Sequence, residues 1–299
     1  MIWIYLGRLK KIIKDTINDS INIIDKALNE YTKFESTYQE EIYKAMRYSL
    51  FNGGKRLRPI IAIKTFEIFS HEIEKVIPYA SAIEMIHTYS LIHDDLPAMD
   101  DDNMRRGKPT NHIVFGEALA ILAGDGLLNL AFETMNKDVL ENSNGLDDCR
   151  RKIRAIYEIA SYAGNQGMIG GQVVDLFANA HNMDSDKLNF MYQKKTAALF
   201  QASTVAGAII GGASDEEVEI LREFALNLGL AFQIVDDILD AEEDKKISKL
   251  THLSFYNLEK SKADIRKYSN NAFELLDRLE DKDTGFLREL TDFLIDRDM

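Results

Sequence analysis

The feature that most restricts the fold of this chain is an apolar repeat of three to four residues that almost no proline interrupts. Ile13, Ile17, Ile21, Ile24 and Leu28 recur on one face of a helix. Only four prolines occur in 299 residues, and no alternating run marks a strand. Further helices are predicted over 38–51, 59–69, 73–96, 116–136, 149–163, 186–210, 215–240, 254–280 and 286–296. The sequence therefore predicts an all-α protein, a single domain over residues 1–299.

Composition limits the partners that the chain can have. Its 36 Lys and Arg against 49 Asp and Glu give a formal charge of −13, so neither nucleic acid nor an anionic membrane is expected as a main partner. The single cysteine, Cys149, excludes an intramolecular disulfide and suits a reducing compartment. The apolar residues at the start are too few for a membrane span and precede basic ones, the reverse of a signal peptide. We expect a cytoplasmic protein without stable membrane anchoring.

An unusual acidic cluster, LIHDDLPAMDDD, places five carboxylates within nine residues at the end of an apolar segment. Like charges this close disfavour one another's ionisation. Asp94 and Asp100 are six residues apart with Pro97 between them, so they cannot share one straight helical face. The segment is expected to bend around a ligand.

A second cluster, AFQIVDDILD, ends the helix predicted over 215–240, which Ser214 and Glu217 open as a capping box. Asp236 and Asp240 share a face, and Asp237 is three residues before Asp240. A solvated acidic patch is the simpler interpretation. However, aspartates at a helix C-terminus oppose its dipole, and two such clusters indicate a compensating cation. Carboxylates together with phosphate oxygens are what Mg²⁺ prefers.

Basic and polar residues near these clusters suggest anion sites. Lys55, Arg56 and Arg58 lie between a double glycine and Pro59 in FNGGKRLRPI, although basic turns are also common on surfaces. Arg105 and Arg106 follow the first cluster, and could either neutralise it or bind phosphate. His87 and Ser90 share a polar stripe with Asp94, so two interpretations of His87 are equally favoured: it faces a cavity, or it is a core histidine with its hydrogen bonds satisfied. His93 is interpreted as structural.

Four glycines in the otherwise helical segment GNQGMIGGQVVDL would cost stability unless something approaches the backbone closely, and Gln172 and Asp175 lie three apart in this segment. Lys194, Lys195 and Thr196 follow in QKKTAAL.

Jointly, these segments resemble the bacterial trans-prenyl diphosphate synthases of the farnesyl and geranylgeranyl type, over nearly the whole chain. The matching segments are GGKRLRP, HTYSLIHDDLPAMDDDNMRRGKPTNH, GMIGGQVVDL, KKTAALF, GLAFQIVDDILD and LIDRDM. The resemblance implies an isoprenoid synthase helical bundle around a deep central cavity, a homodimer, and Mg²⁺-dependent head-to-tail condensation of isopentenyl diphosphate with an allylic diphosphate.

The resemblance also implies roles for single residues. Asp94, Asp95, Asp100, Asp236 and Asp240 would hold three Mg²⁺ ions on the allylic diphosphate, and the first four of them, with Lys195, are the expected catalytic groups. Arg105, Lys195, Thr196 and Gln233 would contact the allylic substrate. Lys55, Arg58, His87 and Arg106 would form the isopentenyl diphosphate pocket.

In one place the chain departs from the family pattern. After DDILD the family carries a longer loop, and about a dozen of its residues have no counterpart here. Lys249 matches the lysine that follows that loop, and Lys245 or Lys246 would replace an earlier one. A loop shortened in this way would impair closure of the active site.

Product length is expected to depend on Tyr89, five residues before Asp94, because an aromatic side chain there resembles farnesyl-forming enzymes. Helical geometry alone leaves open whether Tyr89 faces the tunnel or is a plain core tyrosine, and Ser90 is too small to block it. We expect a C15 product, with C20 as the alternative.

Three other functions remain to be weighed. A non-catalytic subunit of a heteromeric prenyl synthase would be expected to lose one aspartate motif, and this chain keeps both. A terpene cyclase would need an Asn/Ser/Glu metal motif in place of DDILD. A carboxylate-bridged di-iron bundle would need Glu-x-x-His pairs, which are absent.

Overall fold

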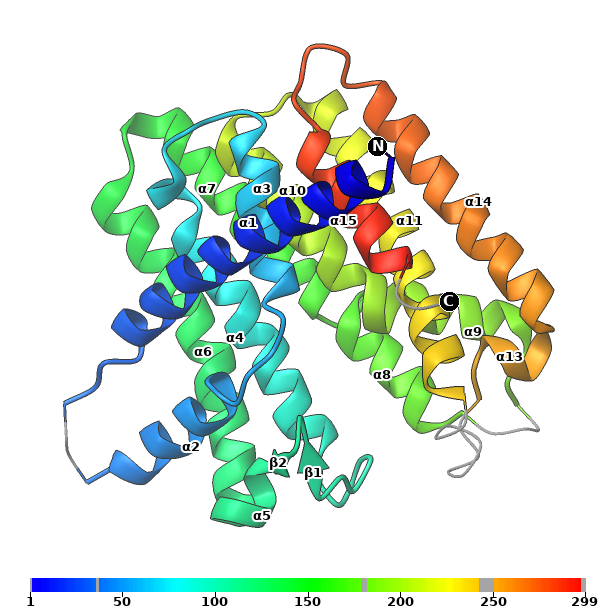
Figure 1. The fold of residues 1–299 in the computed structure, drawn as a ribbon. Helices are drawn as coiled ribbons and strands as arrows, with labels where there is room; N and C mark the ends of the chain where they lie inside the picture. The colour runs from blue at the N-terminus through cyan, green and yellow to red at the C-terminus, as the bar shows by residue number, and fades with distance from the viewer. Residues whose placement is uncertain (1, 36–37, 179–181, 242–249, 297–299) are drawn as a thin grey trace.

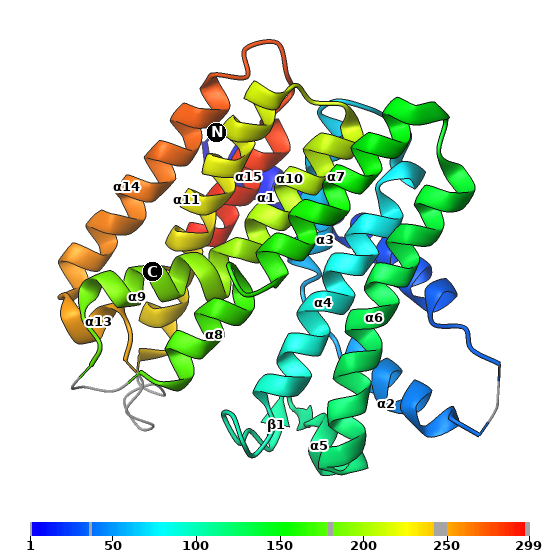
Figure 2. The ribbon, with the colours of Figure 1, turned by 180° about the vertical axis from the view of Figure 1, so that it is seen from behind.

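A computed structural model describes residues 2–35, 38–178, 182–241 and 250–296, with side chains from Ile13 onward. The predicted all-α fold is confirmed, and Figures 1 and 2 show the helical bundle from two sides. The helices are α1 (Ile2–Tyr31), α2 (Glu40–Leu50), α3 (Leu57–Glu67), η1 (Ile73–Lys75), α4 (Ile77–Asp94), α5 (Asn111–Phe115), α6 (Glu117–Asn142), α7 (Gly145–Ala163), α8 (Met168–Leu176), α9 (Ser185–Met191), η2 (Tyr192–Ala197), α10 (Ala198–Gly211), α11 (Asp215–Leu239), α13 (His252–Phe255), α14 (Leu258–Asp277) and α15 (Gly285–Ile295).

The core forms around α4 and α10, which are buried on nearly all of their faces and are correspondingly apolar all round. The stripe predicted on α1 faces this core, with Ile13, Ile24 and Leu28 buried and the two isoleucines between them partly buried. The predicted capping box starts α11, since Ser214 N–H donates to Glu217 Oε2 at 2.7 Å. These local signals were therefore sufficient to predict the main helices.

Three predicted helices have a different internal structure. The predicted helix 254–280 is interrupted after Phe255, because Asn257 caps a new helix, α14, by accepting from Lys260 N–H. The predicted helix 73–96 is split into the 3₁₀ turn η1 and α4, because Pro78 in the first turn of α4 has no N–H to continue an earlier helix. The predicted helix 186–210 is continuous but contains the π-helix η2 between α9 and α10. A π-helical turn inside a helix is rare and often lies at a functional site.

The sequence showed no strand pattern, yet a small antiparallel hairpin follows the first acidic cluster. Strands β1 (Met104–Arg105) and β2 (Lys108–Pro109) pair with Met104 opposite Pro109. The two turn residues, Arg106 and Gly107, both have positive φ, as a tight type I′ hairpin requires. Strands of two residues are too short for an alternating pattern to reveal them.

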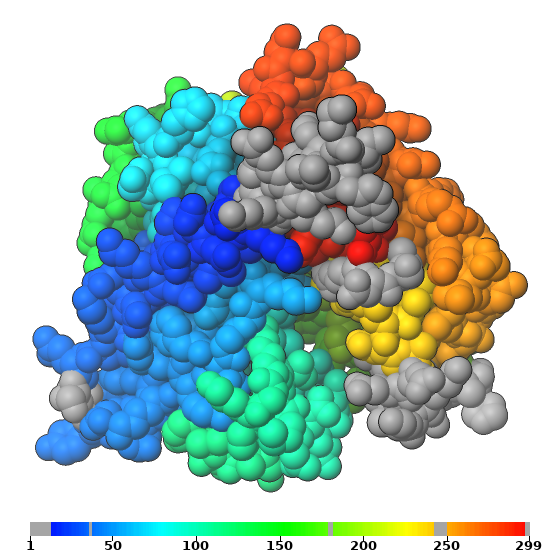
Figure 3. Space-filling model, viewed as in Figure 1, coloured from blue at the N-terminus to red at the C-terminus, as the bar shows by residue number. Residues whose placement is uncertain are grey.

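The C-terminal ends of α4 and α11, where the two acidic clusters lie, are found at the same end of the bundle, near the hairpin and α13 (Figure 1). In the space-filling view, the surface is hollowed between the teal hairpin region and the yellow end of α11 (Figure 3). The fold thus brings two acidic segments that are about 140 residues apart in sequence to one side of the molecule.

Candidate active site

Two neighbouring cavities lie beside the end of α4, and Arg58 and His87 line both of them. The first, here named the aspartate cavity, has a volume of about 480 Å³. It is also lined by Tyr89, Ser90, Asp94, Gln172, Lys195 and Thr196. The second, here named the basic cavity, measures about 710 Å³. It is also lined by Gly53, Gly54, Lys55, Arg106, Lys108 and Phe232. The predicted isopentenyl diphosphate residues Lys55, Arg58, His87 and Arg106 thus all line the basic cavity. Of the residues predicted for the allylic substrate and its metal ions, Asp94, Lys195 and Thr196 line the aspartate cavity.

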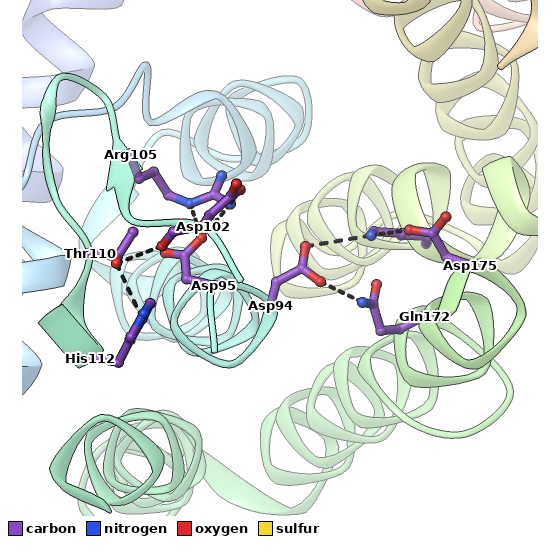
Figure 4. Close-up of polar contacts among 9 residues, drawn as sticks. Asp94, Asp95, Asp102, Arg105, Thr110, His112, Gln172 and Asp175 are labelled. Atoms are coloured by element: carbon purple, nitrogen blue, oxygen red, sulfur yellow. Dashed lines mark hydrogen bonds and ion pairs between the residues drawn. The ribbon is translucent and has the colours of Figure 1, made fainter. Parts of the chain in front are cut away.

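The adjacent carboxylates of the first cluster point in opposite directions from the end of α4 (Figure 4). Asp94 faces α8 and η2, where it accepts a hydrogen bond from Gln172 Nε2 and lies 3.5 Å from Lys195 Nζ. Asp95 is buried and accepts from Arg105 Nε at 2.6 Å. Burial raises the pKa of Asp95, although Arg105 opposes this shift. Asp94 is thus directed into the aspartate cavity, whereas Asp95 is engaged by the hairpin.

Beyond α4 the chain bends as predicted. The Asp100 N–H donates to the Asp94 carbonyl at 2.9 Å, and Asp101 adopts a positive φ of 54°. The backbone of the exposed Asp100 therefore lies next to that of Asp94, although the two residues are six positions apart in the sequence. This geometry brings together two of the predicted metal ligands.

The two arginines of the hairpin have different partners. Arg105 binds Asp95 and lies 3.4 Å from Asp102, so in this structure it neutralises the acidic cluster rather than facing the aspartate cavity. Arg106 turns the other way and donates from Nη1 to the Gly53 carbonyl, at the rim of the basic cavity. Arg105 therefore neutralises the cluster, which is one of the two alternatives, and phosphate binding by Arg106 stays a prediction.

The second cluster also divides between exposed and buried carboxylates. Asp240 is exposed at the end of α11, where its N–H donates to the Asp236 carbonyl at 2.9 Å. Asp236 is partly buried, and its charge raises the pKa of Arg58 against the larger effect of burial, which lowers that pKa to about 10. Asp237 is buried and accepts hydrogen bonds from Gln233 one turn earlier on α11, from Tyr192 of η2 and from the N–H of His252. Asp236 and Asp240 therefore remain the members of this cluster that can face a ligand.

The carboxylates fit Mg²⁺ bound together with a phosphate group better than Mg²⁺ bound alone. Within the described ranges, no three Asp, Glu, His or Cys side chains converge closely enough to hold a metal ion. Mg²⁺ is normally held by only one or two carboxylates, and water and substrate phosphates complete its octahedron. Oxygen donors from Asp94, Asp100 and Asp236 match this chemistry.

Lys195 and Thr196 are presented by the π-helix η2. Lys195 Nζ lies 2.5 Å from Asp175 Oδ2. Burial would lower the pKa of Lys195, but Asp175 and Asp94 outweigh burial and raise it, so the side chain remains charged. Thr196 Oγ1 donates to Gln233 Oε1 at 2.6 Å.

Glycines allow two helices to pack directly on η2. A Cβ on Gly171 of α8 would lie 2.2 Å from the Lys195 backbone nitrogen, and one on Gly229 of α11 would lie 2.6 Å from Ala197 Cβ. The close backbone approach expected from the glycine-rich segment is confirmed at Gly171. Gln172 and Asp175, which bind Asp94 and Lys195, had no predicted role, although their spacing of three residues on this segment was a signal that could have identified them.

In the basic cavity, His87 is held neutral beside two arginines. Arg58 Nη1 lies 3.2 Å from His87 Nε2, and because a guanidinium can only donate, Nε2 accepts and the proton resides on Nδ1. Burial lowers the pKa of His87 well below its usual value, and Arg58 and Arg106 lower it further. The buried Arg58 Nε has no hydrogen-bond partner among the described residues, so it is a donor suited to an anionic ligand.

Tyr89, whose position helical geometry left open, lines the aspartate cavity together with Ser90. Burial raises the pKa of Tyr89 to about 12, and its hydroxyl has no hydrogen-bond partner in the described part of the chain. His93 packs edge-on against Tyr89 at 5.7 Å between ring centroids, and its Nε2 lies 3.1 Å from the Ile121 carbonyl. Lys249, Lys245 and Lys246 lie outside the described residues.

Comparisons with known proteins agree with this arrangement. A family model described as polyprenyl synthetase matches residues 39–253. The farnesyl diphosphate synthase of Bacillus subtilis (strain 168) is 41% identical over 292 residues, which cover 94% of this chain and 96% of that protein. The heterodimeric geranylgeranyl pyrophosphate synthase large subunit 1 of Arabidopsis thaliana chloroplasts is 44% identical over 268 residues, or 85% of this chain and 71% of that protein.

Among solved structures, a farnesyl/geranylfarnesyl diphosphate (FPP/GFPP) synthase from Zymomonas mobilis superposes with a TM-score of 0.84 at 34% identity, covering 97% of this chain and 99% of that one. A geranyltransferase from Legionella pneumophila superposes with a TM-score of 0.86 at 30% identity, covering 96% of this chain and 98% of that one.

Proposed function

The chain belongs to the polyprenyl synthetase family and is a short-chain prenyl diphosphate synthase, and we propose that it joins isopentenyl diphosphate to an allylic diphosphate to make farnesyl diphosphate. The observation that carries this proposal is the pair of cavities that share Arg58 and His87. Two diphosphates bound by residues that adjoin Arg58 and His87 would bring their hydrocarbon parts within reach of each other, as a bimolecular condensation requires.

Each cavity supplies the side chains that one substrate needs. In the aspartate cavity, the charged Lys195 would contact the departing diphosphate of the allylic substrate. Mg²⁺ held by Asp94, Asp100 and Asp236 would neutralise that diphosphate and favour its departure. In the basic cavity, Lys55 and the other cations would hold isopentenyl diphosphate.

The reaction needs no nucleophile from the protein. Ionisation of the allylic C–O bond leaves a cation, which the double bond of isopentenyl diphosphate attacks. The released diphosphate, still bound nearby, would take the proton that the intermediate loses. The apolar part of the aspartate cavity, including Leu128, Met168 and Leu199, would keep water away from the cation.

The proposed reaction is tested with labelled isopentenyl diphosphate, an allylic primer and Mg²⁺. The wild-type protein should form prenyl product, and Asp94→Ala or Asp236→Ala should lower turnover by several orders of magnitude without unfolding the protein. Asp147→Ala, which alters a side chain of 94% exposure on α7, is the matched control and should leave turnover unchanged. Near-normal activity of both cavity variants would refute the assignment. An inactive wild-type protein would instead favour a non-catalytic subunit.

The proposed C15 product rests on Tyr89, a bulky and largely buried side chain on the wall of the aspartate cavity. Tyr89→Ala should lengthen the product, whereas Ser90→Ala beside it should not, because serine is too small to limit the chain. Chromatography of the dephosphorylated products distinguishes C15 from C20. A geranylgeranyl product is the second candidate, because several similar proteins carry that name. An unchanged product in Tyr89→Ala would place the limit elsewhere.

We propose that two copies associate through α5 and the start of α6. Ile113, Val114, Ile121 and Leu122 are each about half exposed there, which is costly for neighbouring apolar side chains unless another surface covers them. By length and hydropathy, α6 would also suit a membrane span, alone among the described helices, but it packs against α4 and α2 within the bundle. Sedimentation should show a dimer, and Leu122→Asp should weaken it; a monomeric wild-type protein would refute the assignment.

We also propose that the protein acts in the cytoplasm and that residues 1–299 fold as one domain. The larger of two buried apolar clusters extends from Ile13 in α1 to Leu294 in α15, and α11 contributes to both clusters, which supports a single domain. Limited proteolysis that released two stable fragments would argue against it.

A further inference from the structure

Asp237 differs from the other carboxylates of the second cluster in burial and in its partners. Only 4% of its surface is exposed, whereas Asp240 is exposed and Asp236 is partly buried. Its carboxylate accepts hydrogen bonds from Gln233 of α11, Tyr192 of the π-helix and the backbone of His252 in α13. Gln233 lies one turn earlier on α11 itself, and the other two donors come from elements that pack around the end of α11.

The two oxygens of Asp237 have separate partners. Oδ1 accepts from Gln233 Nε2 at 2.9 Å. Oδ2 accepts from the Tyr192 hydroxyl and from His252 N–H at 2.8 Å. Since an ionised carboxylate can only accept, the NH₂ end of Gln233 must face Asp237. The carbonyl end of Gln233 is then directed at Thr196, whose hydroxyl donates to it at 2.6 Å.

We propose that Asp237 is a positioning residue, and not a metal ligand: it orients the Gln233 amide and, through it, Thr196 at the wall of the aspartate cavity. This inference rests on the proposed function, because it concerns how the allylic site is held in shape. A buried carboxylate with three donors is already satisfied, and turning it toward a cation would leave those donors without a partner.

The Asp237 carboxylate also binds the start of α13. His252 is the first residue of α13, so its N–H is one of the donors that the helix itself leaves unsatisfied, and Asp237 accepts it. His252 is held in turn through Nδ1, 2.8 Å from Ser261 Oγ on α14. Asp237 therefore joins the π-helix, α11 and the α13–α14 region at one point.

The proposal predicts that exchanging the amide and the carboxylate between positions 233 and 237 restores a donor opposite an acceptor. Gln233→Glu should place two carboxylates against each other and lower kcat/KM for the allylic substrate about 10-fold or more, with a lower Tm. In the double variant Asp237→Asn/Gln233→Glu, the Asn NH₂ can donate to the Glu at position 233, while its carbonyl oxygen still accepts from Tyr192 and His252. The double variant should therefore regain Tm and at least part of kcat/KM relative to Gln233→Glu.

Magnesium dependence separates this role from metal binding. Asp236→Asn should raise the Mg²⁺ concentration needed for half-maximal rate, whereas Asp237→Asn should leave it within about twofold of wild type. Tyr192→Phe, which removes one donor and retains the ring, should raise the allylic KM without changing the Mg²⁺ requirement.

Each outcome decides the proposal. A higher Mg²⁺ requirement in Asp237→Asn, or a double variant that is no more stable than Gln233→Glu or does not fold, would overturn it. If wild-type protein shows no prenyl transfer, the proposed function fails, but the Tm comparison still tests the hydrogen-bond arrangement because it needs no substrate.

Discussion

Arg56 stands between two predicted ligand-binding residues but points into the core. It is 3% exposed and donates to Glu84, itself 2% exposed, at 2.8 Å. It also donates to the carbonyl of Leu50 at 2.7 Å and to that of Gly53 at 3.3 Å. The side chain therefore holds the turn that presents Lys55 rather than binding an anion itself. Arg56→Met, which keeps the length of the side chain and removes its charge, tests this role.

The loss expected from Arg56→Met follows from burial. Removing one partner of a buried ion pair costs about 3–5 kcal/mol, because Glu84 is left charged and unpaired. Each carbonyl that loses a donor adds about 1 kcal/mol at most. The further pair with Asp25, which is 41% exposed, contributes little. A total loss of about 4–6 kcal/mol would be a large part of the free energy of unfolding of a typical domain, which is about 5–15 kcal/mol.

Urea unfolding followed by circular dichroism, at one fixed protein concentration, measures this loss. Lys33→Met is the matched control, because Lys33 Nζ lies only 2.6 Å from Glu30 but the two side chains are 68% and 56% exposed. Its expected cost is below about 1 kcal/mol despite the shorter distance. Arg56→Met/Glu84→Leu should recover about half of the loss, since the unpaired charge is gone while the two carbonyls still lack donors.

The reasoning would be refuted if Arg56→Met cost no more than the Lys33 control. It would also be refuted if the second substitution recovered no stability, because then the unpaired Glu84 charge would not be the cause. In the folded double variant, KM for isopentenyl diphosphate should rise, since the turn that carries Lys55 has lost its anchor.

Three further predictions follow from the geometry. Gly171→Ala should lower kcat sharply, because its Cβ would lie 2.2 Å from the Lys195 backbone nitrogen. Gly126→Ala should have little effect, because its Cβ would meet only the ends of the Met46 and Ile42 side chains, and equal activity of the two variants would count against this packing. His87→Gln should reduce the loss of stability in acid. The pKa of His87 is depressed in the folded state, so the unfolded chain takes up the proton first and the wild-type protein is destabilised as pH falls below about 6.5. An unchanged pH dependence of the urea midpoint in this variant would contradict the prediction. Lys55→Ala should mainly raise KM for isopentenyl diphosphate and Lys195→Ala should mainly alter allylic KM or kcat, and identical effects on both substrates would argue against two pockets.

The sequence by itself determined the helical class, most helix positions and the types of residue at the site. Apolar periodicity, capping boxes and proline positions act within a few residues, so they can be read without the rest of the fold. The stripe on α1 and the cap of α11 are examples that the structure confirms. Carboxylates at two helix ends likewise indicated a cation, because the conflict with the helix dipole is local.

The directions in which these side chains point follow from tertiary contacts. Asp94 and Asp95 are adjacent, yet Asp94 faces Gln172 and Lys195, which are 78 and 101 residues away, while Asp95 binds a hairpin that no sequence pattern revealed. Asp237 follows Asp236 directly, but its burial depends on segments that arrive from elsewhere in the chain. Residues far apart in sequence set these directions through contacts, and a local pattern contains no information about which distant partner will be there.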